Sequence, residues 1–296
     1  MLTGKRMTGS LEILLATVIW GYGYVVIRDS LDMISLSFLM TSRYLTAFMV
    51  LALIFVRKLG KMTGRALADG AVLGVFLCIG QYFQTWALGC EDTTAGKVAF
   101  ITALYVVLVP FLQWALWKKR PGKKCLFSVL LALPGLLLLT GAGNAGIGKG
   151  DFLALAGSLG FTVHILAADR FTEQEDTILL TVLQFGFAAL AAGAVQLLAG
   201  VSFPLEQFCP AVLWPLIYLG IFSTMCGFLL QLLGQEKLPP AVSAVLLAME
   251  SVFGMFFSVV LLGEHLTMGS LAGCVLMFAA VLLAGQEKDA HTGETK

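Results

Sequence analysis

The sequence predicts an all-α polytopic membrane protein with ten transmembrane helices in two inverted five-helix repeats. The prediction depends on its composition, the spacing of its apolar segments and an internal repeat. Hydrophobic residues make up 58% of the 296 residues and charged residues only 12%. A soluble domain could not cover so much apolar surface with so few charges. The net charge of +1 gives no basic field that would attract nucleic acid, so no nucleic-acid partner is expected.

Ten apolar segments have a length close to the roughly 20 helical residues that a bilayer crossing requires. The connections between them are short, which leaves no room for a separate soluble domain. Any activity must therefore reside among the helices, in contact with the lipid bilayer. The predicted spans lie near 10–28, 34–56, 69–89, 94–116, 124–141, 151–170, 177–199, 211–233, 240–262 and 267–285.

Lysine and arginine concentrate on one side of these spans, and such an excess marks the cytoplasmic side. Both termini are therefore expected in the cytoplasm. The opposite side has only Arg28, Lys97 and Lys149. The basic residues of the first side are Lys5, Arg6, Arg57, Lys58, Lys61, Arg65, Lys118, Lys119, Arg120, Lys123, Lys124, Arg170, Lys237, Lys288 and Lys296.

An internal repeat emerges when Gly89 is paired with Gly234. The pairing aligns "GCEDTTAGKVAFITALYVV" with "GQEKLPPAVSAVLLAMESV" and places the third and fourth spans on the eighth and ninth. A displacement by five spans is odd, so the second copy must cross the membrane in the opposite sense. Inverted repeats are a recurrent architecture of secondary transporters, which hold their substrate near the midplane between the two halves.

The six cysteines and three histidines form no pattern that binds a metal. No CxxC pair or histidine-linked cluster occurs, so neither a zinc site nor a disulfide framework is expected. The sequence also lacks a P-loop. We therefore expect no cofactor, no metal and no catalytic residue.

Several motifs resemble the drug/metabolite transporter superfamily, in its EamA-type branch. The resemblance implies ten helices in two inverted repeats, and movement of small metabolites across the bacterial inner membrane. It divides the chain into repeats at 1–145 and 146–286 and a cytoplasmic tail at 287–296. Many relatives have a proline after the glutamate of the ninth span, whereas this chain has Ser251. The motifs are "LLATVIWGYGYVVIRDSL" (14–31), "SFLMTSRYLTA" (37–47), "GKVAFITALYVVLVPFLQWALWKKRP" (96–121), "GDFLALAGSLGFTVHILAADRF" (150–171) and "AVSAVLLAMESVFGMFFSVVLLGEHLT" (241–267).

Glu250 is a carboxylate in the middle of the ninth predicted span. A charge at that depth costs several kcal/mol unless it is paired, neutralised or hydrated. One interpretation is a cavity carboxylate that binds a cationic group or exchanges a proton. The alternative is a structural hydrogen bond to a neighbouring helix. Tyr105 occupies the equivalent position in the first repeat and is too deep in its span for an interfacial aromatic residue.

Arg43 and His164 are the other ionisable residues at depth. Arg43 could bind a substrate carboxylate or pair with a helix carbonyl, or its long side chain could reach the membrane surface. His164 could contact the ligand or relay a proton, or it could form a hydrogen bond that joins two helices.

Polar and aromatic side chains complete the predicted substrate-binding set. Gln81 and Gln84 share one helical face at i and i+3, which favours a common lining role, although each amide could equally form a hydrogen bond between helices. Trp20 and Tyr24 share a face at i and i+4 and could line a cavity or belong to an interfacial aromatic belt.

These observations predict a secondary transporter that moves a small metabolite, such as an amino acid or a related compound, by alternating access. The resemblance favours export, and Glu250 or His164 could couple transport to protons. A membrane-embedded enzyme is the first alternative, but the sequence places all its aspartates at loops or span ends. A non-transporting membrane scaffold is the second.

Overall fold

The computed structural model describes residues 4–93, 95–118, 120–140, 147–201, 210–262, 267–284 and 286, and the predicted tail at 287–296 lies outside them. Every regular element in these ranges is a helix. The first half contains α1 (Gly4–Leu31), α2 (Leu36–Ile54), α3 (Val56–Leu59), α4 (Gly64–Leu88), α5 (Ala95–Thr102), α6 (Tyr105–Trp117) and α7 (Lys123–Thr140). The second half contains α8 (Lys149–Thr172), α9 (Thr177–Leu198), α10 (Pro210–Ile217), the π-helix η3 (Tyr218–Cys226), α11 (Gly227–Gln235), α12 (Pro240–Leu247), α13 (Glu250–Leu262) and α14 (Met268–Ala284).

Eight helical stretches among the described residues are long and apolar enough to cross a membrane. They coincide with eight of the ten predicted spans. The fifth and tenth predicted spans correspond to α7 and to the shorter apolar helix α14, which pack against each other. Membrane crossing by these two helices stays a prediction. The eight stretches are Gly4–Leu31, Leu36–Ile54, Gly64–Leu88, Val98–Trp117, Lys149–Thr172, Thr177–Leu198, Val212–Gln235 and Pro240–Leu261.

Polar residues in the short turns fix where several helices begin. Ser35, Thr63 and Asp176 precede α2, α4 and α9, and each side chain accepts a hydrogen bond from the backbone N–H three residues later. Such N-caps satisfy N–H groups that have no partner inside the helix. Asp176 also forms an ion pair with Lys58 of α3, which joins the two halves of the chain at this end.

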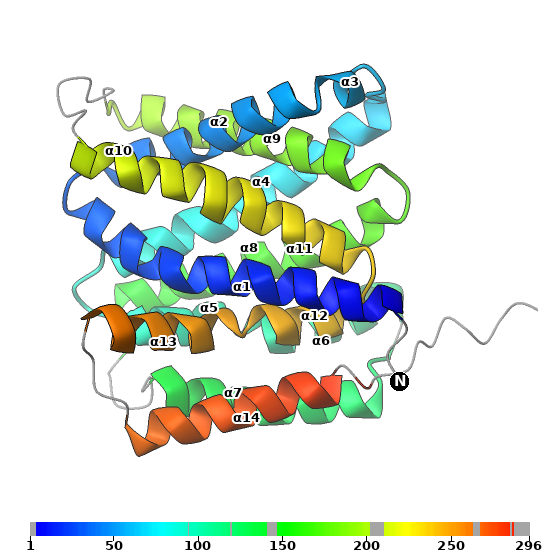
Figure 1. The fold of residues 1–296 in the computed structure, drawn as a ribbon, viewed down its shortest axis with the longest axis vertical. Coiled ribbons are helices and arrows are strands. Elements are labelled where there is room, and N and C mark those ends of the chain that lie inside the picture. The colour runs from blue at the N-terminus through cyan, green and yellow to red at the C-terminus, as the bar shows by residue number, and fades with distance from the viewer. Residues whose placement is uncertain are drawn as a thin grey trace, which may run out of the picture.

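The helices pack in a pattern that is preserved when the two halves of the chain are exchanged. The α2 helix packs against its counterpart α9, and α7 packs against its counterpart α14. The first helix contacts α13 and α11, just as α8 contacts α5, α6 and α4. Figure 1 shows the α2–α9 pair and the α7–α14 pair at opposite edges of the bundle, with the remaining helices between them. Each of these helices thus packs against the helices equivalent to its counterpart's partners, as a two-repeat architecture requires.

Basic residues gather at one end of the bundle. The N-terminal end of α1 and the C-terminal end of α14 lie at this end (Figure 1). Lys124, at the start of α7, donates from Nζ to the backbone oxygen of Gln286 at 3.3 Å, so α7 begins where α14 ends. Lys237 forms an ion pair with Glu12 of α1 at 2.6 Å.

Candidate functional site

Two spans are interrupted at equivalent positions. The α5 helix ends at Thr102 and α6 begins at Tyr105, while α12 ends at Leu247 and α13 begins at Glu250. The repeat alignment pairs Tyr105 with Glu250, so each of these residues is the first of its half-helix. Interrupted helices in corresponding positions of two repeats are a pointer to a transporter's binding site.

Tight turns rather than prolines interrupt these two spans. The N–H of Leu104 donates to the carbonyl three residues earlier at 3.1 Å, and the N–H of Met249 does the same at 3.0 Å. This is the spacing of a 3₁₀ turn. Ser251, and not a proline, follows Glu250, yet the ninth span is interrupted. Pro110 lies inside α6, five residues beyond the first interruption, and Pro134 and Pro215 lie inside α7 and α10.

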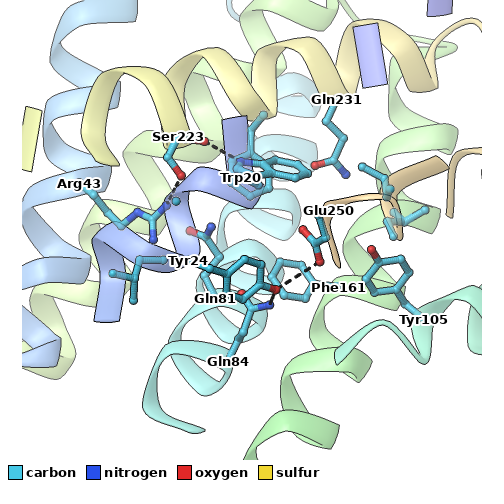
Figure 2. A pocket seen from close by; sticks show the side chains of 15 residues that line it. Trp20, Tyr24, Arg43, Gln81, Gln84, Tyr105, Phe161, Ser223, Gln231 and Glu250 are labelled. Atoms are coloured by element: carbon cyan, nitrogen blue, oxygen red, sulfur yellow. Dashed lines mark hydrogen bonds between the residues drawn. The ribbon is translucent and has the colours of Figure 1, made fainter. Parts of the chain in front are cut away.

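A cavity lies beside the two interruptions. It encloses about 540 Å³ of space free of protein atoms, which includes space open to the outside. Residues from both halves of the chain line it (Figure 2). Seven of the eight predicted site residues are among them, namely Trp20, Tyr24, Arg43, Gln81, Gln84, Tyr105 and Glu250.

A short chain of hydrogen bonds connects Glu250 to two other residues that line the cavity. The residue is 8% exposed. The Tyr24 hydroxyl donates to Oε1 of Glu250 at 3.4 Å, and Nε2 of Gln84 donates to the Tyr24 hydroxyl at 2.8 Å. Figure 2 shows Tyr105 on the other side of the carboxylate, with its hydroxyl directed toward Glu250. Helices α1, α4, α6 and α13 therefore converge on this acid.

Arg43 enters the same cavity from α2. The residue is 1% exposed. Its Nε donates to Thr224 Oγ1 at 2.8 Å and its Nη2 donates to Ser223 Oγ at 3.1 Å. Nη1 has no hydrogen-bond partner. The side chain does not extend to the membrane surface, so the snorkelling alternative does not describe this structure.

The π-helix η3 supplies the partners of Arg43. Its wide turn places Ser223 and Thr224 toward α2, and the Thr224 hydroxyl in turn donates to the carbonyl of Leu219 at 2.7 Å. The Ser223 carbonyl accepts a hydrogen bond from Nε1 of Trp20 at 2.8 Å. Isolated π-helical turns occur frequently at functional sites.

His164 lies behind the wall of the cavity. It is fully buried and does not line the cavity. Its Nε2 lies 3.0 Å from Oε1 of Gln184 on α9. Because an amide oxygen only accepts, His164 donates through Nε2. This contact joins α8 to α9, as the helix-joining interpretation expects.

The two predicted lining amides make different contacts. Gln81 accepts a hydrogen bond through Oε1 from the Tyr44 hydroxyl at 2.8 Å. Gln84 donates to Tyr24, as described above. Both side chains line the cavity, so the face of α4 that the i and i+3 spacing defines is the face turned toward the cavity.

Sequence reasoning missed several lining residues because most carry no polar signal. The apolar members could not be separated from ordinary core residues of a span. Ser223 gave no signal either, since a serine in a span usually bonds to its own helix. The missed residues are Gly23, Ile27, Phe161, Ile165, Ser223, Phe228 and Leu247.

No group of three or more His, Cys, Asp or Glu side chains able to hold a metal occurs within the described residues. The cavity chemistry is therefore that of one carboxylate, one guanidinium, amides and aromatic rings.

Comparison with known families identifies the chain. A family model described as the EamA-like transporter family matches residues 7–141 and, a second time, residues 148–286. The chain belongs to this family. The two matches fall on the two halves that the packing relates, and the protein is a multi-pass membrane transporter with a small-molecule substrate.

Relatives that match the chain over most of its length are also transporters by name. An uncharacterized transporter of Archaeoglobus fulgidus is 29% identical, covering 94% of this chain and 86% of its own length. The uncharacterized transporter YetK of Bacillus subtilis is 26% identical over 89% of this chain and 82% of its own. The uncharacterized inner membrane transporter YicL of Salmonella typhimurium is 22% identical over 95% and 96%.

A solved crystal structure has the same fold. It superposes with a TM-score of 0.74 at 18% identity, and the match covers 94% of this chain and 96% of the other.

Proposed function

We propose that this EamA-like transporter is a secondary transporter that exports a small polar or amphipathic metabolite, such as an amino acid or a related compound, by alternating access. The observation that supports it is the cavity at the two interrupted spans, which both repeats line. Its single carboxylate and single guanidinium suit a polar ligand. We place the protein in a bacterial inner membrane with both termini in the cytoplasm, and we place the repeats at 1–145 and 146–286.

A closed end on the N-terminal side of the cavity supports alternating access. The lining residues of α1 begin at Trp20. Nearer the N-terminus α1 contacts α11 directly, since a Cβ on Gly9 would lie 3.0 Å from the backbone oxygen of Gly234. Lys237 and Glu12 form their ion pair beside this crossing. Separation of α1 from α11 would open the cavity toward this end, so we propose that the crossing is the cytoplasmic gate.

Glu250 is the group that we assign to proton coupling. It lies in the cavity, whereas His164 lies behind the wall. The titratable and charged groups around Glu250 are Tyr24 on α1, Tyr105 on α6 and, elsewhere in the cavity, Arg43 on α2. A carboxylate that alternates between a proton and a ligand ammonium links the two fluxes.

Proteoliposomes test this assignment. Glu250→Gln keeps the shape of the side chain and removes its charge, so flux driven by an imposed pH gradient should vanish while the thermal stability of the protein is retained. Glu173→Gln is the matched control, because Glu173 is exposed at the end of α8 and its carboxylate lies 3.5 Å from Arg170. Undiminished pH-driven flux in Glu250→Gln would exclude Glu250 as the coupling group.

A further inference from the structure

The cavity contains two opposite charges that do not neutralise each other. Arg43 and Glu250 both line it. Within the described residues no Asp or Glu oxygen lies within 4.0 Å of Arg43, and no Lys, Arg or His nitrogen lies within 4.0 Å of Glu250. A buried charge without a counter-charge is costly. A ligand group of opposite sign would therefore stabilise each of them.

The Arg43 guanidinium retains hydrogen-bonding capacity. Two of its nitrogens donate to the neutral hydroxyls of Ser223 and Thr224, and Nη1 has no partner. The two hydroxyls fix the orientation of the planar group without neutralising it. A guanidinium held in this way is suited to a carboxylate, which accepts from it in a charge-assisted hydrogen bond.

The Glu250 carboxylate also retains hydrogen-bonding capacity, as an acceptor. Its hydrogen bond from Tyr24 is long, at 3.4 Å, and the donor is an uncharged phenol. Tyr105 faces it from the other side with a second phenol (Figure 2). Two phenols can orient a carboxylate and still leave lone pairs for the N–H groups of a ligand ammonium.

An aromatic and aliphatic wall separates the two charged groups. Tyr24 lies between Arg43 and Glu250 in Figure 2, with Trp20 alongside. Phe161 and Phe228 also line the cavity. This wall can contact the apolar part of a ligand whose two charges reach in opposite directions.

Resting on the proposed transport function, we infer that the cavity selects a zwitterion by its two charges, with Arg43 binding the anionic group and Glu250 binding the ammonium group. A purely cationic ligand would leave Arg43 uncompensated and would meet a like charge in a site of low dielectric constant. A purely anionic ligand would meet the same penalty at Glu250. Because Coulomb energies increase as the dielectric constant falls, both penalties are larger here than in water.

The test uses three probes that differ in which charged groups they carry. Proteoliposomes are loaded with a bacterial small-molecule extract supplemented with 6-aminohexanoate, whose two charges lie at opposite ends, its decarboxylated amine pentylamine and its deaminated acid hexanoate. Downhill release is followed by mass spectrometry against protein-free liposomes. We expect release of zwitterions at rates about tenfold or more above those of the matched amine and acid.

Two variants should change the preference in opposite directions. Arg43→Gln should favour amines over zwitterions, and Glu250→Gln should favour acids over zwitterions, whereas Arg43→Lys should keep the zwitterion preference. A purely structural role for either residue would lower release of all three classes together. Arg28→Gln and Asp29→Asn remove exposed charges at the end of α1 and are the matched controls.

The outcomes separate this inference from the proposed function. If amines alone or acids alone are released, the zwitterion inference is wrong and the transporter proposal stands. Equal loss of all classes in Arg43→Gln or Glu250→Gln also overturns the assignment of the two charges. Absence of release for every compound in the extract would instead contradict the proposed transport function itself.

Discussion

At the scale of single residues, the Tyr24 hydroxyl is the link between α4 and the Glu250 carboxylate. It accepts a hydrogen bond from Gln84 and donates one to Glu250. A hydroxyl that already accepts from an amide is oriented so that its own proton points away, toward the carboxylate. Gln84 therefore positions the phenol and acts on Glu250 only through it.

This chain of contacts predicts a non-additive pair of substitutions. Tyr24→Phe removes the hydroxyl that orients the Glu250 carboxylate toward a ligand, so substrate affinity should fall by about tenfold. Gln84→Leu should cause a similar loss, because it releases the hydroxyl from its orientation. The double variant should be little worse than Tyr24→Phe alone, measured as the KM for transport. Additive losses would mean that Gln84 contacts the substrate independently of Tyr24.

At the scale of helices, the crossing of α1 and α13 explains the Trp20-Gly21 pair. Trp20 lines the cavity, and Gly21 brings α1 into backbone contact with α13. A Cβ on Gly21 would lie 2.6 Å from Cβ of Phe253 and 2.7 Å from the backbone nitrogen of Gly254. Small residues allow such close helix contacts in membranes. The position of Glu250 relative to Tyr24 depends on this approach.

Two glycines at this crossing should respond differently to alanine. Gly21→Ala forces the helices apart and should cost about 1–3 kcal/mol, seen as a lower melting temperature in detergent. Gly254→Ala is the matched control, because its Cβ would have its nearest atoms at 3.8 and 3.9 Å, which is ordinary contact. It should be neutral or slightly stabilising, since alanine favours helix more than glycine. Equal destabilisation by the two variants would contradict this account of the crossing.

The helices were more predictable from sequence than their interruptions. Apolar length alone located the eight spans found among the described residues, because the bilayer imposes a single requirement on length. The repeat alignment also predicted that Tyr105 and Glu250 are equivalent. The turns before these residues, and the π-helix that carries Ser223, were not predicted, because short i+3 and i+5 hydrogen-bonding patterns leave the hydropathy of a span unchanged. Sequence could not show whether His164 lines the cavity, since depth in a span does not determine whether a side chain faces the cavity or a neighbouring helix.

At the scale of the whole molecule, the exchange of packing partners between the two halves makes α7 and α14 counterparts. They form a pair at one edge of the bundle (Figure 1). If one of them crosses the membrane, the inverted repeat requires the other to cross as well. Lys124 at the start of α7 and Gln286 after the end of α14 lie together, so the two helices run antiparallel. This pairing makes the ten-span topology open to a direct test at a few exposed positions.

Cysteine labelling at four exposed positions would establish whether these helices span. Met62, Ile147 and Met268 are 44%, 83% and 81% exposed, and Gln286 is exposed as well. In a variant without native cysteines, Ile147→Cys and Met268→Cys should react with an impermeant maleimide in intact cells. Met62→Cys and Gln286→Cys should react only after permeabilisation, because the basic residues beside Met62 mark the cytoplasmic side. Three spans separate Met62 from Ile147, so labelling of both from the same side would mean that α7 does not cross. Labelling of Gln286→Cys from the side of Met268→Cys would exclude a crossing by α14, and with it the inverted ten-helix arrangement.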